Sequence, residues 1–590
     1  MKKRLVFDIE VYKNYALFSF SNLDCSKYIE LEMYGGHPLE KDKLRKILTN
    51  YTIITFNGDN FDIPIAFAAC HGADNKRLKA ICDHIIKTGD PGWLTVKNFN
   101  IRRMDVDHID IKEPSPGVGV SLKLYGGRLG APKLQDLPIE PDSIIQPEQR
   151  EPLRLYCRND LHTTRDLYKA VEHEITLREE MNKEYDVDLR SKSGAQVAKA
   201  VFGKLLGDIG VDVHTPKIKS GTSYKYSMPD WVTFKTDKME AVKQLVIKSS
   251  FVVNDKGSVL IPKELQKVIE FDGAKYKIGI GGLHSQEKKQ AMIPTDNQLL
   301  FEKDVGSMYP NIIVGQNLYP KHLGKSFVIM YKNMITERLA AKAAGNKAVS
   351  NSLKLVLNSS FGLFGNRYSF LYSPDLLIQT TITGQLCLLM LIERLAEIDV
   401  KVVSANTDGV NVLCYKDQYD DVEDVCFQWE LETGLNLEEN PYQATYNESV
   451  NSYIAIERSG SVKSKGNYAA LGLMKNPNNP ICSDAVISYL VNGDDIENTI
   501  TNETDIAKFL TVRTVNGGAV FHDEYLGRVV RFYHSTDGDS IHYKKNGNKV
   551  PKSDGCKPMM DLSGNMPSDL DYNWYVNESY KMLGLLGAKQ

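Results

Sequence analysis

Short apolar runs alternate with longer amphipathic stretches over the first 190 residues of this chain. Residues 5–8, 16–20 and 52–56 have the length and the apolar content of strands. The clearest helical pattern spans about residues 148–180 and follows Gln146-Pro147, a pair typical of a helix start. Strands that alternate with helices predict an α/β domain over residues 1–190.

The pattern changes after residue 190. Residues 191–300 are less regular, with short strand candidates at 251–253 and 259–261 and a glycine-rich stretch at 278–285. We expect a strand at 299–303 that leads into a helix over 307–313, and a hairpin of strands 401–405 and 410–413 around an Asp-Gly turn. Beyond about residue 480, clusters of Asn, Asp and Gly predict a smaller, mobile C-terminal domain.

Length and composition limit the class of protein. A chain of 590 residues should hold roughly three to five domains, and 42% hydrophobic with 25% charged residues is ordinary for a soluble globular protein. The start of the chain is unlike a signal peptide, and the most apolar stretch, 386–392, is too short to span a bilayer. Nine scattered cysteines without a C-x-x-C pair argue against zinc modules and disulfides, so we expect a soluble cytoplasmic protein.

The net charge of −3 does not by itself indicate nucleic-acid binding, but the charge is unevenly distributed. Between Lys321 and Lys354, Glu337 is the single acid among eight charged residues. A second basic stretch runs through residues 544–557. Either stretch could follow the phosphates of a nucleic acid, and either could be a solvated surface.

One group of carboxylates lies in the first 190 residues. Asp8 and Glu10 are two positions apart on a predicted strand, so they share a face. Asp62 follows the strand 52–56, and Tyr156 and Asp160 are one turn apart on the long helix. Four acids in one place repel one another unless cations neutralise them. Two divalent metal ions would do so and would support the hydrolysis of a phosphodiester.

These segments resemble a known nuclease family. Phe7-Asp-Ile-Glu10, Asn57-Gly-Asp-Asn-Phe-Asp62 and Tyr156-Cys-Arg-Asn-Asp160 resemble, in this order, the three exonuclease motifs of the DnaQ-like 3′→5′ proofreading domain, which has a ribonuclease-H-like fold. Residues 121–125 and 134–137 are similar to a leucine-rich segment of that domain. The resemblance implies that Tyr156 orients the attacking water and that four acids bind metal: Asp8, Glu10, Asp62 and Asp160.

A second group of acids lies between residues 300 and 410. Asp304 and Asp408 each lie where a predicted strand meets an exposed turn, and Lys354 lies in a basic, helix-like stretch between them. Carboxylates at two strand ends can hold a pair of divalent metal ions, and a basic helix nearby can hold a polyphosphate. The arrangement predicts nucleotidyl transfer.

This second group resembles the polymerase motifs of family-B DNA polymerases. Asp304-Val-Gly-Ser-Met-Tyr-Pro310 resembles D-x-x-S-L-Y-P, Lys354-x-x-x-Asn358-Ser-x-Phe361-Gly362 resembles K-x-x-x-N-S-x-Y-G, and Asn406-Thr-Asp408 resembles D-T-D. The nuclease motifs precede them, as in that family. Over roughly its first 470 residues, the chain therefore looks like a compact, phage-like family-B DNA polymerase.

The resemblance implies roles for further residues. It makes Asp304, Val305 and Asp408 metal ligands, with two Mg²⁺ ions in each active site and Mn²⁺ as a substitute. Tyr309 corresponds to a steric gate against the ribose 2′-hydroxyl. Segment 463–468 resembles the family's primer-holding segment and 278–282 its template-contacting one, although a glycine-rich turn is an equally good interpretation of the latter. The implied dNTP-binding residues are Tyr309, Arg338, Lys342, Lys354, Asn358 and Phe361, and the implied DNA-binding residues are Lys463, Lys465, Tyr468, Gly281 and Gly282.

The implied fold is multidomain, α/β and α+β. A ribonuclease-H-like exonuclease domain is followed along the chain by a right-hand polymerase with palm, fingers and thumb. We expect the exonuclease domain at 1–190, a connecting region at 191–295, the palm at 296–320 and 366–475, the fingers at 321–365 and the thumb at 476–590. The implied partners are primer–template DNA, single-stranded DNA and dNTPs, together with a processivity or replisome factor. The resemblance also implies a monomer that replicates a phage or mobile-element genome. Such a protein would act in the host cytoplasm and would not bind a membrane.

The chain departs from the family pattern in three places. Asn406 replaces the first acid of D-T-D, which would weaken metal affinity or shift the metal preference, and Phe361 replaces a tyrosine but keeps the stacking face. The gap from Tyr309 to Lys354 is short, which argues against protein priming and intrinsic high processivity. Asn406 leaves open a DNA-binding 3′→5′ exonuclease with a degenerate polymerase site. A primase or RNA polymerase is a second alternative, which Tyr309 argues against.

Overall fold

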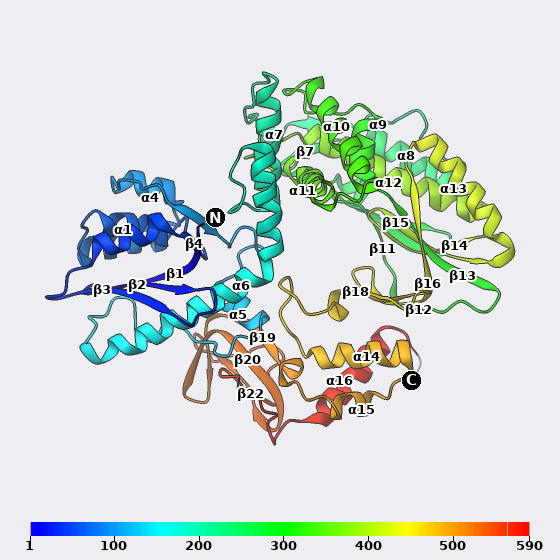
Figure 1. The fold of residues 1–590 in the computed structure, drawn as a ribbon. Coiled ribbons are helices and arrows are strands. Elements are labelled where there is room, and N and C mark those ends of the chain that lie inside the picture. Colours follow the sequence, from blue (N-terminus) through cyan, green and yellow to red (C-terminus); the bar gives the residue numbers. More distant parts are fainter. Residues whose placement is uncertain (1, 563, 589–590) are drawn as a thin grey trace. The chain divides into compact units, whose positions relative to one another are not determined.

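The computed structural model describes residues 2–562 and 564–588, and the chain divides into two compact units. Unit 1 consists of Met1–Ser193, Leu471–Ile481 and Ile500–Tyr575, and unit 2 consists of Gly194–Ala470, Cys482–Thr499 and Val576–Gln590. Both units contain helices and sheets, so this is a mixed α/β multidomain protein (Figure 1). The segment 476–590, expected as one domain, is shared between the two units.

Unit 1 is built on a five-stranded sheet in the order β3-β2-β1-β4-β5. The central strand β1 (Arg4–Val11) pairs antiparallel with β2 (Tyr15–Asn22) and parallel with β4 (Thr52–Thr55). The outer strands are β3 (Tyr28–Tyr34) and β5 (Asp107–Asp110). Strands therefore occur at all three of the runs 5–8, 16–20 and 52–56 that the sequence predicts.

Alternation along β1 sends apolar side chains to one face of the sheet and acids to the other. Phe7 and Ile9 join a hydrophobic core with residues of three helices, including Ile47 and Ile81. Asp8 is contacted from the opposite face by Cys157. The helices of unit 1's first segment are α1 (Lys41–Asn50), α2 (Asp62–Cys70), α3 (Asn75–Thr88), α4 (Gly92–Asn98), α5 (Leu122–Arg128) and α6 (Arg150–Tyr185).

Helix α6, with 36 residues, extends the helix predicted at 148–180 at its C-terminal end. A 3₁₀ turn, Pro147–Gln149, leads into it, and Gln146 and Gln149 form a capping box around that turn. The helix ends where Asp186 adopts a left-handed conformation with φ 52°. Tyr156 and Asp160 thus lie on one continuous helix, one turn apart.

The turn-rich C-terminal part of unit 1 forms a four-stranded sheet in the order β21-β19-β20-β22. Its strands are β19 (Thr511–Phe521), β20 (Glu524–Asp539), β21 (His542–Tyr543) and β22 (Cys556–Pro558). Arg531 of β20 is 1% exposed and donates hydrogen bonds to the carbonyl oxygens of Ala131 (2.7 Å) and Met559 (2.8 Å). Lys557 of the second basic stretch is ion-paired with Asp569 at 2.6 Å. This sheet is therefore fastened to the α/β part of unit 1.

Unit 2 is built on a ten-stranded antiparallel sheet in the order β18-β17-β16-β13-β15-β14-β11-β10-β9, with β12 paired to β16. Its strands are β9 (Ile269–Phe271), β10 (Ala274–Ile278), β11 (Leu283–Ser285), β12 (Lys288–Met292), β13 (Gln298–Val305), β14 (Lys401–Asn406), β15 (Gly409–Tyr415), β16 (Leu437–Ser449), β17 (Ser452–Glu457) and β18 (Val462–Lys465). The predicted strand at 299–303 and the predicted hairpin at 401–413 lie side by side in its centre.

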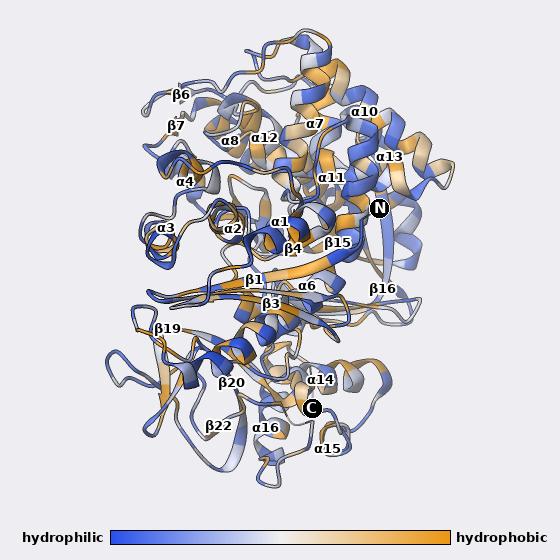
Figure 2. Cartoon of the chain, turned by 60° about the vertical axis from the view of Figure 1, so that its left-hand side comes forward, coloured by the Kyte–Doolittle hydropathy of each residue, from blue (hydrophilic) through white to orange (hydrophobic). Residues whose placement is uncertain are grey.

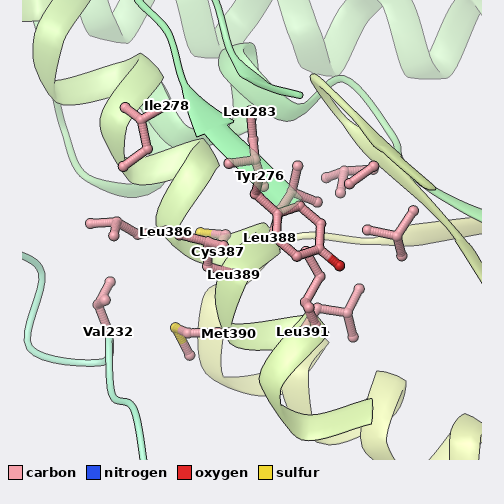
Figure 3. Packing of buried hydrophobic residues seen from close by; sticks show 14 of the residues in the cluster. Val232, Tyr276, Ile278, Leu283, Leu386, Cys387, Leu388, Leu389, Met390 and Leu391 are labelled. Atoms are coloured by element: carbon pink, nitrogen blue, oxygen red, sulfur yellow. The ribbon is translucent and has the colours of Figure 1, made fainter. Parts of the chain in front are cut away.

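One face of this sheet is covered by the core helix α12 (Pro374–Glu397). Leu386, Cys387 and Leu389 lie among apolar side chains from the sheet, including Tyr276 and Leu283 (Figure 3). Among the described residues, α12 is the one helix long and apolar enough to cross a membrane by length and composition, and 94% of its apolar window is buried inside the protein. The apolar run at 386–392 thus belongs to a longer, buried helix.

Helices α8 (Asp237–Lys248), α9 (Met308–Gly315) and α13 (Tyr419–Thr433) add buried side chains to this core. Hydrophobic and hydrophilic residues are interleaved along the helices of unit 2 (Figure 2). The aromatic rings of Phe202, Phe327 and Tyr331 contact one another, with Phe202 and Tyr331 stacked at a centroid separation of 5.9 Å. The remaining strands are β6 (Ser223–Tyr224), β7 (Phe251–Val253) and β8 (Val259–Leu260), and the remaining helices are α7 (Gly194–Asp208), α10 (Lys325–Ala343), α11 (Lys347–Leu363), α14 (Pro480–Asn492), α15 (Ile496–Thr501) and α16 (Tyr572–Leu585).

Candidate active sites

The first candidate site lies between β1 and α6 in unit 1. Ligand atoms of Asp8, Glu10 and Cys157 all lie within 4.8 Å of one another. The Cys157 thiol donates a hydrogen bond to Asp8 Oδ2 at 3.4 Å. The two strand acids are therefore held against the helix that also carries Tyr156 and Asp160.

Asp62 and Asp160 complete this acidic group. Asp62 is the first residue of α2, is 3% exposed, and has an Oδ1 atom without a hydrogen-bond partner in the described part of the chain. Asp160 accepts a hydrogen bond from the Tyr156 side chain. The charge of Asp8 repels the carboxylates of both Glu10 and Asp62. The structure thus brings together the four carboxylates singled out from the sequence, with Tyr156 beside them.

Burial raises the pKa of each of these carboxyl groups, and repulsion within the group adds to this effect at Asp8, Glu10 and Asp62. Burial, followed by the charge of Asp160, raises the pKa of Asp8 to about 7. Burial, followed by the charge of Asp8, holds the pKa of Glu10 and of Asp62 well above the ordinary value. Burial also raises the pKa of Asp160 to about 6. When ionised, the group is a set of oxygen donors with little counter-charge, which suits a hard divalent cation.

Lys123 is a basic residue of this site that sequence reasoning did not single out. It lies on α5, with Nζ 5.1 Å from the centre of the Tyr156 ring and 3.2 Å from Asp136 Oδ1. Its charge lowers the pKa of Asp8 and Asp160 against the larger, raising effect of burial. The segment 121–125 resembles the nuclease family through its leucines, so nothing in the sequence marks the lysine between them.

The second candidate site lies where β13 meets the β14–β15 hairpin in unit 2. Asp304 pairs with Gly409, and the N–H of Val305 donates to the carbonyl oxygen of Asp408 at 2.7 Å. Thr407 and Asp408 form the two-residue turn, one residue earlier than the predicted Asp-Gly turn, and Thr407 is left-handed with φ 54°. Glycine leaves room for the acid, because a Cβ on Gly409 would lie 3.2 Å from Asp304 Oδ1.

A cavity of about 230 Å³ is bordered by both aspartates. Burial, followed by the charges of Asp408 and Glu302, raises the pKa of Asp304 to about 7. Partial burial also raises the pKa of Asp408. Acids and lysines that face one cavity suit a complex of divalent metal with phosphate. The charged and amide residues of its lining are Glu302, Asp304, Asn406, Asp408, Asn411, Asn447, Lys463 and Lys465.

Tyr309, near the start of α9, is held by two contacts. Its ring stacks on Phe361 of α11 at a centroid separation of 4.4 Å and an interplanar angle of 20°, and its hydroxyl donates to the carbonyl oxygen of Gly281 at 2.5 Å. A Cβ added to Gly282 would lie 3.0 Å from Thr407 Cγ2. The structure thus places the predicted gate, the predicted stacking residue and the glycine-rich turn next to the β14–β15 turn.

The other residues predicted to bind the nucleotide do not line the 230 Å³ cavity. Arg338 of α10 donates from Nη1 to Ser307 Oγ at 3.1 Å, and its Nε is buried without a partner among the residues described. Lys342, Lys354 and Asn358 are exposed on α10 and α11, and none of them lines the 230 Å³ cavity. Of this set, Arg338 is the residue held against the segment that begins α9.

Tyr468 requires a correction. Lys463 and Lys465 of β18 line the cavity, but the Tyr468 ring is 1% exposed. Its hydroxyl donates to the carbonyl oxygen of Met582 in α16 at 3.1 Å. A buried ring that anchors a helix has no free face for a nucleic acid, so Tyr468 is a core residue of unit 2 rather than a DNA contact.

Glu302 lines the cavity but is absent from the predicted set of site residues. It lies two residues before Asp304, so the two acids share a face of β13. The same acid-x-acid spacing marks Asp8 and Glu10 in the first site. This repeated spacing is the signal that could have found Glu302 from the sequence.

The similarity of this chain to known proteins is distant. No protein-family model matches it, and no curated protein does. Among solved structures, it is similar to the family B DNA polymerase from the hyperthermophilic archaeon Pyrobaculum calidifontis. The two share 12% sequence identity at a TM-score of 0.42, and the match covers 100% of this chain and 79% of that one. A likeness this distant carries no conclusion about activity, so the function has to be argued from the residues.

Proposed function

We propose that the protein is a template-directed DNA polymerase with a separate 3′→5′ exonuclease site. The observation that carries the proposal is the meeting of Asp304 and Asp408 at one cavity that also presents Lys463 and Lys465. A second acidic group around Asp8, in the other unit, supports a nuclease activity beside it. The order of the motifs along the chain supports the same conclusion, because it is the order found in family-B polymerases.

Each unit receives one activity in this proposal. In unit 1, the strand order β3-β2-β1-β4-β5 supports a ribonuclease-H-like exonuclease domain. In unit 2, the antiparallel sheet around β13 supports a palm, and helices α10 and α11 support fingers. The segment proposed as the thumb is the one shared between the units.

At the polymerase site, Asp304 and Asp408, with the backbone of Val305, fit divalent cations. Two carboxyl groups with raised pKa values border one cavity, and positive charge would relieve their repulsion. When bound, Mg²⁺ or Mn²⁺ would supply activation of the primer 3′-hydroxyl and stabilisation of charge on the leaving pyrophosphate.

The protein's own side chains position the substrates in this proposal. The Tyr309 ring, held by Phe361 and Gly281, excludes a ribose 2′-hydroxyl. Lys463 and Lys465 bind the primer backbone as point charges. The residues proposed to bind the incoming nucleotide are Tyr309, Arg338, Lys342, Lys354, Asn358 and Phe361.

At the exonuclease site, the unpartnered Oδ1 of Asp62 and the carboxylates of Asp8, Glu10 and Asp160 fit divalent cations of the same kind. Tyr156 is hydrogen-bonded to Asp160, so its hydroxyl is placed to orient the water that attacks the terminal phosphodiester. The neighbouring thiol, Cys157, stays protonated because burial and then the charge of Asp8 hold its pKa well above the ordinary value.

Lysines near the polymerase site support nucleic acid as the partner. Cavities of about 850 and 620 Å³ in unit 2 share Lys275 and Lys288 in their linings, and Lys277 and Lys401 each line one of them. Lysines that line neighbouring cavities can contact the phosphates of a nucleic acid. The proposed partners are primer–template DNA, single-stranded DNA and dNTPs. A processivity factor, a monomeric state, a host-cytoplasmic location and a phage or mobile-element genome rest on the motif resemblance alone.

An exonuclease with a degenerate polymerase site is a second candidate, and one observation favours it. Asn406 lines the catalytic cavity where the resembled motif has an acid, so the cavity carries less negative charge than that motif would supply. Asp304 near the end of β13 and Asp408 in the adjacent turn remain as two carboxylates that would hold divalent metal at this cavity.

A primed-template assay separates these candidates. A labelled primer on a longer template should shorten when Mg²⁺ or Mn²⁺ is added without nucleotides, and should extend to the template end when dNTPs are added. Shortening without incorporation under either metal would favour the nuclease alone. Incorporation of rNTPs as readily as dNTPs would favour a primase or RNA polymerase.

A further inference from the structure

Glu302 is held in place in the polymerase cavity by three hydrogen bonds. Its side chain is 17% exposed, and its Oε2 atom accepts from the Tyr442 hydroxyl at 2.7 Å, from Lys463 Nζ at 3.0 Å and from Asn440 Nδ2 at 3.4 Å. Tyr442 is 2% exposed, so one end of this network is anchored in the buried layer of the sheet. The carboxylate therefore has little freedom to turn away from the cavity.

Lys463, in contrast, starts from the edge of the sheet. Its strand β18 is the last in the order β18-β17-β16-β13, so two strands separate it from β13. A lysine side chain is flexible and strongly hydrated, and at a sheet edge it would extend into water. The ion pair with Glu302 draws its ammonium group into the cavity, close enough to Asp304 for each charge to affect the other.

Asn406 lines the same cavity without a charge. Its Oδ1 atom accepts a hydrogen bond from the Thr407 hydroxyl at 3.2 Å. The motif that this hairpin resembles has an acid at the position of Asn406, so the hairpin here contributes one carboxylate, Asp408, instead of two. Glu302 brings a further carboxylate to the same cavity from β13.

We propose that Glu302 is a positioning residue, which holds the Lys463 ammonium group beside Asp304 so that it can bind a backbone phosphate of the primer strand. Glu302 thereby supplies the negative charge that the hairpin lacks at Asn406. The inference rests on the proposed polymerase function for the identity of the bound strand. A purely structural ion pair predicts something different, because it would stabilise the fold and leave DNA binding unchanged.

Substitution of Glu302 by glutamine distinguishes positioning from bulk charge. By charge alone, removing an acid near a DNA-binding surface should tighten DNA binding. Loss of positioning should weaken it, so for Glu302→Gln we expect the KM for primer–template to rise about tenfold while kcat changes less than about threefold. Fluorescence anisotropy with labelled primer–template in EDTA should show the same loss without catalysis. Glu302→Asp should restore part of the affinity.

Glu439→Gln is the matched control. Glu439 is ion-paired with Lys303 at 2.9 Å, and Lys303 points to the face of β13 opposite Glu302. The control therefore removes the same charge from the same sheet, while Lys303 keeps its ion pair with Glu423, and it should leave the KM unchanged. Lys463→Ala should raise the KM as Glu302→Gln does. The double variant should be no worse than either single variant, because both act through one interaction.

Asn406→Asp in the Glu302→Gln background should return the KM toward that of the unsubstituted protein, because it restores a carboxylate to the cavity. Three results would each overturn the inference: unchanged or tighter DNA binding by Glu302→Gln, no recovery with Asn406→Asp, or a variant that loses thermal stability and exonuclease activity as well. If the unsubstituted protein extends no primer with Mg²⁺ or Mn²⁺, the proposed function fails instead. The anisotropy measurements then decide the inference alone.

Discussion

At the scale of the residue, Asp62 illustrates the electrostatic imbalance of the exonuclease site. Its Oδ1 is buried and unpartnered among the described residues, and Asp8, Glu10 and Asp160 add three further carboxylates. Burying ionised groups without partners costs several kcal/mol each. Lys123 offsets part of that charge, as one cation against four acids. The stability of unit 1 should therefore respond to both pH and divalent ions.

The sign of the pH response follows from the raised pKa of Asp8. Because that pKa is raised from 3.8 to about 7, the ionised form is disfavoured in the folded protein. Its contribution to the free energy of unfolding is fully present below about pH 4 and is lost as the pH rises to about 7. Asp8→Asn should raise the melting temperature at pH 8 in EDTA by about 5 °C and should change little at pH 4. Scanning calorimetry measures both.

At pH 8, divalent ions should make the melting temperature of the unsubstituted protein higher than that of Asp8→Asn, which is the reverse of the order in EDTA. Binding to the folded state at a hundredfold excess over Kd stabilises by about 2.7 kcal/mol, so Mn²⁺ should raise the melting temperature of the unsubstituted protein more than that of Asp8→Asn. Asp24→Asn, which removes an exposed acid of the same unit, controls for lost charge. A lower melting temperature of Asp8→Asn in EDTA, or an undiminished Mn²⁺ shift, would count against a metal site.

At the scale of the element, local periodicity explains what the sequence could predict. Asp8 and Glu10 share a face because a strand alternates, and Tyr156 and Asp160 share one because a helix turns every 3.6 residues. Asp304 lies near the end of β13, a strand that the sequence also predicts. Each of these placements depends on residues close together in the sequence. The local patterns and the order of the motifs were therefore enough to predict which acids belong to each group.

The features that the sequence did not predict depend on contacts between distant segments. Tyr468 is buried because α16, more than a hundred residues later, covers it. Lys463 meets Glu302 across 161 positions, and Lys123 meets Asp136 only because the loop after α5 folds back. No local pattern contains such pairings, so the correct lining of each site required the tertiary structure.

The attachment of the β19–β22 sheet to the α/β part of unit 1 can be tested at Arg531. Its guanidinium donates to carbonyl oxygens in two segments far apart in the sequence, those of Ala131, Pro132, Met559 and Met560. Arg531→Leu would remove the guanidinium donor from the carbonyl oxygens of Ala131 and Met559, at about 1–3 kcal/mol each, whereas the carbonyl oxygens of Pro132 and Met560 still accept from backbone N–H groups. We therefore expect the melting temperature to fall by about 10 °C. Hydrogen exchange should also quicken over residues 129–134.

Arg528→Leu is the control for that experiment. Arg528 lies on the same strand with an exposed side chain, and its contact to Asp136 is made by the backbone N–H, which the substitution keeps. The melting temperature of the control should therefore be close to that of the unsubstituted protein. Equal melting temperatures for the two variants would mean that Arg531 does not fasten the sheet.

At the scale of the whole molecule, the chain builds two units and gives each an acidic site. Both units are assembled from three separate segments, so the chain passes between them several times. A predicted linear order of domains misses this exchange, because motifs mark positions along the chain and not which segments pack together. Truncation at about residue 475 would remove parts of both units, so point substitutions are the better way to separate the two proposed activities.

The most direct test of the two-site account compares two variants on one primed template. Asp304→Ala should abolish primer extension and leave the shortening of single strands intact, whereas Asp8→Ala combined with Glu10→Ala should abolish shortening and leave extension intact. Melting temperatures near that of the unsubstituted protein would show that both variants are folded. If either variant loses both activities while folded, the account of two independent carboxylate sites is contradicted.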